Sequence, residues 1–182
     1  GAWAGFRCTP SEEAAIAAAA HVPAVMVEPV IAEVERLHAA GLLARPLVSA
    51  DFLGFRHYTV ERFAATMAQV DLGFVGWPGG LHDPAVGALR DVAHDLAKIV
   101  VVTFGAQGVR VFDGRPGGGD AQVEVTAVPV VGTTVGCGDA FIAGFLAAWW
   151  ATGDLLVAVE RGKVTGARAT AWRRPLPDEA YG

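Results

Sequence analysis

The residues with the clearest chemical potential form one short run, Gly136-Cys137-Gly138-Asp139, at the start of a long apolar segment. A glycine turn that leads into a helix exposes backbone N–H groups at the positive end of the helix dipole, and this arrangement binds phosphate and other anions. Asp139 adds a carboxylate that would repel a resting anion. It would be useful there if it accepts a proton from an attacking hydroxyl while the N–H groups hold the displaced charge. The run predicts either an anion hole beside a general base or an acidic helix cap after a tight turn.

The elements that must hold this run alternate between short strands and helices. Apolar, β-branched runs predict strands at residues 21–27, 46–50, 70–75 and 99–103. Capped or amphipathic segments predict helices at residues 9–20, 29–41, 60–68 and 84–97. This alternation predicts an α/β fold, a three-layer α/β/α domain whose mostly parallel sheet is covered on both faces.

The pattern changes beyond Gly105. Strand-like segments at 109–113 and 123–128 flank a glycine-rich polar stretch, which predicts a β-hairpin with a mobile tip. An apolar helix at 140–150 and a last helix from about Leu155 to Trp172 follow. No internal repeat or low-complexity linker divides the sequence, so we expect residues 1–182 to form a single domain.

Composition excludes several classes of protein. The formal net charge is −5 and no cluster of Lys and Arg is present, which argues against a nucleic-acid-binding surface. Apolar runs are all interrupted well before the roughly 20 residues that a membrane crossing needs. The two cysteines, Cys8 and Cys137, show neither disulfide nor zinc spacing, and the histidines show no ligand spacing. With no secretory signal in view, we expect a cytoplasmic protein with reduced thiols.

The sequence resembles the ribokinase or PfkB-type carbohydrate kinases. Their C-terminal signature, Asp-Thr-x-Gly-Ala-Gly-Asp followed by an aromatic residue and a glycine-containing helix, is matched by residues 134–141. A second family feature, a strand ending in Thr-x-Gly-x-x-Gly, is matched by residues 103–108. The likeness covers nearly the whole chain. Its nearest branch is the fructoselysine 6-kinase-like one, because Gly76-Trp77-Pro78-Gly79 stands in place of Asn-x-x-Glu.

The resemblance implies an activity and a set of roles. The activity is ATP-dependent phosphorylation of a hydroxyl on a sugar or sugar derivative, with Mg²⁺ carried in by the nucleotide. From the residue spacing of the sequence itself, we expect no metal site built from protein residues. Asp139 would be the catalytic base. The N–H groups of Gly136, Cys137 and Gly138 would form the anion hole, and the ATP site would be lined by Thr103, Gly105, Gly108 and Thr134.

Cys137 has two interpretations. A thiol at a helix N-terminus can have a lowered pKa and raised reactivity. The corresponding position in the family holds a small residue, so we favour Cys137 as a residue that fills space.

Three departures from the family pattern bear on activity. The Asn-x-x-Glu motif has no counterpart, and Thr133 stands where the family has Asp. The sequence also begins after the first strands, the Gly-Gly sugar-binding motif and the β-lid of the family, so it resembles the C-terminal part of a kinase. We therefore expect nucleotide binding to survive better than sugar phosphorylation. We also expect an open sheet edge that favours pairing with another chain, for example in a homodimer.

Two other functions fit the sequence. One is a truncated, catalytically silent domain that binds a nucleotide or a partner chain. The other is a Rossmann-like binding protein unrelated to kinases, in which Gly136-Cys137-Gly138-Asp139 is only a capped turn.

Overall fold

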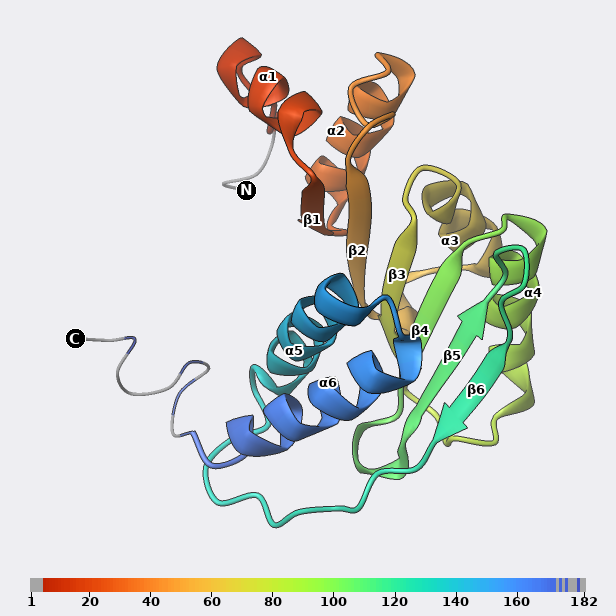
Figure 1. Ribbon diagram of the computed structural model, residues 1–182, viewed down its shortest axis with the longest axis vertical. Helices are drawn as coiled ribbons and strands as arrows, with labels where there is room; N and C mark the ends of the chain where they lie inside the picture. Colours follow the sequence, from red (N-terminus) through yellow and green to blue (C-terminus); the bar gives the residue numbers. More distant parts are fainter. Residues whose placement is uncertain (1–4, 173, 175, 177–179, 181–182) are drawn as a thin grey trace. The chain divides into compact units, whose positions relative to one another are not determined.

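The computed structural model describes residues 5–172, 174, 176 and 180. The strands among these residues form one sheet in the order of the sequence, and β1 to β4 pair in parallel. The α/β fold with a mostly parallel sheet is therefore confirmed. The strands, drawn in Figure 1, are β1 (His21–Val25), β2 (Leu47–Gly54), β3 (Leu72–Gly76), β4 (Ile99–Thr103), β5 (Val109–Asp113) and β6 (Asp120–Val123).

Three helices connect the parallel strands. They are α2 (Glu28–Ala39), α3 (Val60–Met67) and α4 (Gly87–Asp95). Each connection leads to the next strand in the same direction along the sheet, and such crossovers are right-handed, so all three helices cover one face. The parallel arrangement also brings the carboxyl ends of β1 to β4 to a single edge of the sheet.

The first helix, α1 (Pro10–Ala18), begins as the sequence predicts. The Thr9 side chain accepts a hydrogen bond from the backbone N–H of Glu12, and the Glu12 carboxylate accepts one from the N–H of Thr9 at 2.7 Å. This reciprocal capping box fixes the start of the helix.

The chain divides into two compact units. Unit 1 comprises residues 1–103 and 111–120, and unit 2 comprises residues 104–110 and 121–182. Unit 1 contains β1 to β4 with α1 to α4. Unit 2 contains α5 (Cys137–Thr152) and α6 (Leu155–Ala169), which pack against each other. Short 3₁₀ helices occur at Phe55–His57, Pro84–Val86 and Gly105–Gln107.

The hairpin differs from its prediction. The strand expected at 123–128 is wrong, because β6 begins at Asp120 and ends at Val123. The Asp120 carboxylate accepts hydrogen bonds from Arg90 and, at 2.8 Å, from His94, both on α4. These contacts fix the start of β6 several residues earlier than the run of valines suggested.

The outer edge of β1 carries Pro23. Met26 donates its N–H to the Asp51 carbonyl, and Leu47 donates to the Ala20 carbonyl, so the even-numbered residues of β1 face β2. Pro23 therefore faces away from β2, at a position where it offers no N–H to a further strand.

The core of unit 1 consists of aromatic and branched side chains from the sheet and its helices. Phe52, Phe63, Leu72 and Leu89 are fully buried. Among the described residues, no helix is long and apolar enough to cross a membrane.

Candidate functional site

The run around Asp139 forms the start of α5, a 16-residue helix. Gly136 is the N-cap residue and has φ 87° and ψ −7°, a left-handed conformation that glycine adopts without strain. The Gly136 carbonyl accepts the first helical hydrogen bond, from Ala140 at 2.8 Å. The glycine turn leading into a helix is thus confirmed at the backbone level.

The turn uses some of its N–H groups internally and leaves others open. Cys137 donates its N–H to the Thr134 carbonyl at 3.2 Å, and Val135 donates to Thr133 Oγ1 at 3.0 Å. The N–H groups of Gly136 and Gly138 bond to nothing else in the described part of the chain. No atom lies within 4 Å of the position that a Cβ on Gly138 would take. Two backbone donors and open space therefore meet at the positive end of α5.

Asp139 lies in the first turn of α5 and is exposed. Within residues 5–172, its carboxylate forms no hydrogen bond or ion pair. A general base must come within hydrogen-bond distance of the proton that it accepts. The Asp139 carboxylate is exposed, so a substrate hydroxyl can approach it.

The Cys137 thiol favours the packing interpretation. Burial raises its pKa, so it stays protonated near neutral pH. It is half-buried, with Sγ 3.8 Å from the Thr133 carbonyl oxygen.

The second predicted motif forms the connection between β4 and β5. Gly105 has φ 59° and Gly108 has φ 143°, values that strongly favour glycine. Phe104 donates its N–H to the Gly108 carbonyl at 2.9 Å, which closes the loop. Thr103 ends β4 in unit 1, while Gly105 and Gly108 belong to unit 2 together with the start of α5.

The loop at residues 76–79, which stands in place of Asn-x-x-Glu, is held by hydrogen bonds that Trp77 donates. Trp77 donates its indole N–H to Asp83 Oδ2 at 3.0 Å and its backbone N–H to the Thr103 carbonyl at 2.9 Å. Asp83 also caps the 3₁₀ helix at Pro84 by accepting from Ala85. No group of three or more His, Cys, Asp or Glu side chains within the described ranges could hold a metal ion.

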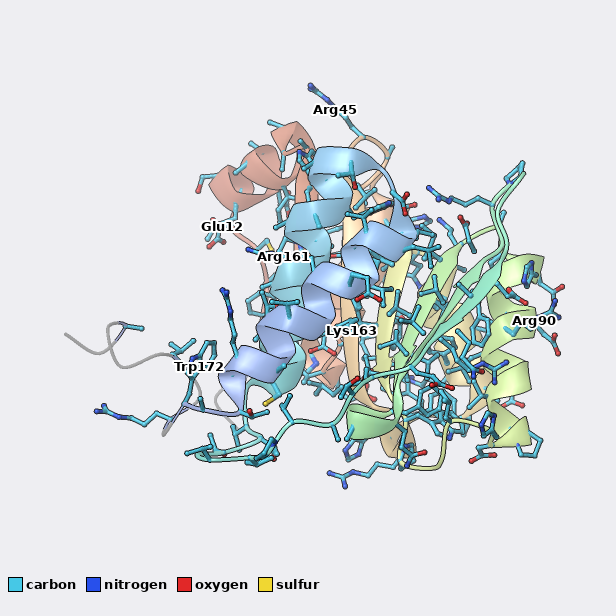
Figure 2. All side chains as sticks on the ribbon, turned by 60° about the horizontal axis from the view of Figure 1, so that its bottom comes forward. Glu12, Arg45, Arg90, Arg161, Lys163 and Trp172 are labelled. Carbon is cyan, nitrogen blue, oxygen red and sulfur yellow. The ribbon has the colours of Figure 1, made fainter. Side chains whose placement is uncertain are left out.

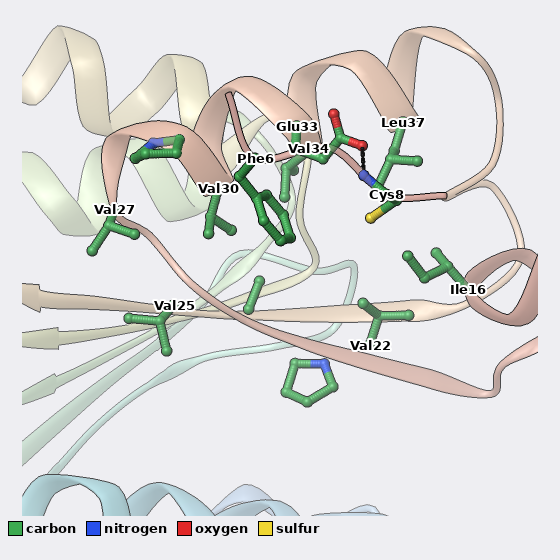
Figure 3. A pocket seen from close by; sticks show the side chains of 13 residues that line it. Phe6, Cys8, Ile16, Val22, Val25, Val27, Val30, Glu33, Val34 and Leu37 are labelled. Atoms are coloured by element: carbon green, nitrogen blue, oxygen red, sulfur yellow. Dashed lines mark hydrogen bonds between the residues drawn. The ribbon is translucent and has the colours of Figure 1, made fainter. Parts of the chain in front are cut away.

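A separate apolar cavity lies in unit 1, and none of the predicted site residues lines it. It has a volume of about 600 Å³ and lies between β1, α1 and α2 (Figure 3). Its charged lining residue, Glu33, accepts hydrogen bonds from Arg36, Arg7 and the Cys8 N–H. Burial and the neighbouring Glu33 raise the pKa of the Cys8 thiol.

Sequence reasoning missed the residues that support the loop before Gly136. Three consecutive N–H groups, from Val131, Gly132 and Thr133, donate to carbonyls at the end of α6. The acceptors are Thr170 and Trp172, about 40 residues further along the chain. The only sequence signal was Gly132 itself, a glycine with no turn to explain it.

Comparisons with known proteins agree with this architecture. The sequence model described as pfkB family carbohydrate kinase matches residues 66–171, more than half of the chain. No curated protein matches the chain at the sequence level. Solved structures that resemble it include a microbiome-derived acarbose kinase, with a TM-score of 0.69 and 24% identity over 92% of this chain and 55% of that one.

Two further structures share the fold. A PfkB protein from a Polaromonas species has a TM-score of 0.64 and 24% identity, over 90% of this chain and 57% of that one. Adenosine kinase from Schistosoma mansoni, solved with adenosine and AMP, has a TM-score of 0.70 and 16% identity, over 90% of this chain and 54% of that one. The chain thus spans about half the length of these structures.

The α/β fold with its mostly parallel sheet matches that of the ribokinase-fold kinases. The chain belongs to the pfkB family of carbohydrate kinases.

Proposed function

We propose that this chain carries the nucleotide-binding and general-base part of a kinase that phosphorylates a hydroxyl of a sugar or sugar derivative. Asp139 is the base, and the N–H groups of Gly136 and Gly138 form the anion hole. The Cys137 N–H, bonded to Thr134, gives the turn its shape. One observation carries the proposal: at the start of α5, a carboxylate and two backbone N–H groups lie together with no hydrogen-bond or ion-pair partner among the described residues.

The chemistry follows from these groups. Asp139 accepts the proton of the acceptor hydroxyl as its oxygen forms a bond to the γ-phosphorus of ATP. The bond from that phosphorus to the bridging oxygen breaks, and its electron pair leaves with ADP. Gly136 and Gly138 donate hydrogen bonds to the transferring phosphoryl group, whose charge the dipole of α5 also stabilises. Mg²⁺ bound with the nucleotide would neutralise phosphate charge.

We assign the rest of the nucleotide site to Thr103, Gly105, Gly108 and Thr134. The positive φ values of the two glycines support this assignment, because a loop without side chains there lets a ligand approach the backbone. The solved adenosine kinase with adenosine and AMP bound has the same fold.

We further propose that the chain corresponds to the C-terminal part of a carbohydrate kinase of the fructoselysine 6-kinase-like branch. The Gly76-Trp77-Pro78-Gly79 loop supports the branch. Phosphoryl transfer requires the acceptor hydroxyl to be held in line with the γ-phosphate. The groups that this chain supplies in the proposal act on the nucleotide and on the acceptor proton, so nucleotide binding is the first property to measure.

A second candidate is a catalytically silent domain that binds a nucleotide or a partner chain. A homodimer through the outer edge of β1 would be one such partnership. Pro23 weakens strand addition at that edge, because it removes an N–H that the added strand would need.

Isothermal calorimetry with Mg²⁺ and a non-hydrolysable ATP analogue tests the proposal. The parent should bind at one saturable site, and Gly138→Glu should abolish binding by placing a carboxylate in the open space of the anion hole. Gly119→Glu is the matched control, since Gly119 is also exposed with nothing within 4 Å of a Cβ. Binding that survives Gly138→Glu would place the nucleotide elsewhere. Absence of binding in the parent would overturn the nucleotide-binding function.

A further inference from the structure

Glycines bring α5 and α6 into close contact. A Cβ on Gly144 would lie 2.1 Å from Thr165 Oγ1, and one on Gly162 would lie 2.8 Å from the ring of Phe141. Since side chains cannot occupy these positions, the two helices pack at a separation that only glycine permits.

A third glycine extends this contact to the start of α5. A Cβ on Gly166 would lie 3.2 Å from the carbonyl oxygen of Cys137 and 3.4 Å from Cβ of Phe141. Cys137 directly precedes Gly138 and Asp139 in the first turn. Any displacement of its peptide group therefore moves the proposed anion hole and the proposed base together.

The end of α6 also holds the loop that enters this turn. Thr170 accepts from Val131 at 3.2 Å and from Gly132 at 2.9 Å, and Trp172 accepts from Thr133 at 3.0 Å. A Cβ on Gly132 would lie 1.9 Å from the Trp172 carbonyl oxygen. Figure 2 shows Trp172 at the end of α6, beyond Arg161 and Lys163.

We infer that Gly166 and Gly132 are positioning residues for the phosphoryl-transfer turn, an inference that rests on the proposed function. Residues of α6 and just beyond it support the turn in two ways. Gly166 lies against the Cys137 peptide group at the start of α5. The carbonyls of Thr170 and Trp172 accept hydrogen bonds from the loop that precedes the turn. Neither glycine is among the residues proposed to bind the nucleotide. Each acts by leaving room for backbone to lie against backbone.

The distance between each new Cβ atom and its nearest neighbour determines how strongly each substitution should disturb the turn. At 3.2 Å, a new Cβ at Gly166 requires the Cys137 peptide to move by a few tenths of an ångström. Misplacement of reacting groups by about 1 Å can cost on the order of 100-fold in rate, so a shift of this smaller size should cost about tenfold. At Gly132 the 1.9 Å approach is too short to relax, so the loop must leave the end of α6.

The test compares Gly166→Ala with Gly144→Ala. The second substitution crowds the same helix pair, but it does so through the Thr165 side chain and not through the Cys137 peptide group. The first readout is the position of the Gly136 and Gly138 amide signals in ¹⁵N-resolved NMR spectra. The second is the calorimetric Kd for the Mg²⁺-bound ATP analogue. Gly87→Ala, a helical glycine with nothing within 4 Å, controls for the substitution itself.

Gly166→Ala should shift both amide signals and raise the Kd about tenfold, because displaced N–H donors form weaker hydrogen bonds to the charged phosphate. Gly144→Ala should lower the thermal unfolding midpoint while leaving amide signals and Kd close to those of the parent. Gly132→Ala should shift the same amides and serves as the second variant if Gly166→Ala does not fold. The inference is overturned if Gly166→Ala leaves both amides in place, or if Gly144→Ala moves them equally. A parent that does not bind the analogue refutes the proposed function, whereas the amide signals still decide the positioning role.

Discussion

Glu33 should make the stability of unit 1 strongly pH-dependent. Its side chain is 2% exposed and accepts hydrogen bonds from Arg36, from the Cys8 N–H at 2.8 Å and from Arg7 at 3.2 Å. The hydrogen bonds from Arg36, opposed by burial, lower the pKa of Glu33 to about 2, against an ordinary value of 4.5. At about 1.4 kcal/mol per pKa unit, this difference corresponds to at most about 3 kcal/mol of stability at neutral pH.

The direction in which stability changes with pH follows from the lowered pKa of Glu33. Above about pH 4.5 the carboxyl is ionised in both folded and unfolded chains, and its full contribution is present. Below that pH the unfolded chain binds the proton first, so stability is lost as the pH falls toward 2. By pH 3.5 the loss should reach about 1.4 kcal/mol.

Urea unfolding followed by circular dichroism at pH 7 and pH 3.5 measures this contribution. Glu33→Gln should be less stable than the parent at pH 7, and the difference should narrow by about 1.4 kcal/mol at pH 3.5. Glu35→Gln, on the exposed face of the same helix, should match the parent at both values. A Glu33→Gln chain as stable as the parent at pH 7, or a difference that does not change with pH, would refute the reasoning.

Two further substitutions test local structure by the same unfolding assay. Asp154→Ala should cost about 1 kcal/mol, because the Asp154 side chain caps α6 by accepting from Leu156 and Val157; unchanged stability would exclude a capping role. Gly114→Ala should cost about 1–3 kcal/mol, because its Cβ would lie 2.0 Å from the Ala93 carbonyl oxygen. Gly119→Ala, in open space in the same hairpin, should leave the stability unchanged. Equal losses of stability in Gly114→Ala and Gly119→Ala would contradict the close contact between Gly114 and Ala93.

The parts of the fold that could be predicted are those specified by local sequence. The helix expected at 9–20 is α1, whose cap is formed by the nearby residues Thr9 and Glu12, and the apolar run at 99–103 matched β4 residue for residue. The glycine turn before α5 was also local, because the left-handed Gly136 and the helix that follows need only neighbouring residues.

The parts that could not be predicted depend on residues far apart in the sequence. The start of β6 is fixed by Arg90 and His94 on α4, which a reading of valine runs could not include. The sequence contains no linker between the two units, because the chain passes between them three times from Thr103 to Ala121. The hydrogen bonds that the Thr170 carbonyl accepts from the loop before Gly136 also join residues far apart in the sequence.

The most direct test of the account is calorimetric titration of Asp139→Asn with Mg²⁺ and the non-hydrolysable ATP analogue. Asp139 is proposed to lie beside the bound phosphate in order to accept a proton, so its negative charge should oppose binding of the resting anion. The account predicts that Asp139→Asn binds the analogue at least as tightly as the parent. Loss of binding in Asp139→Asn with the fold intact, or no binding in the parent, would contradict it.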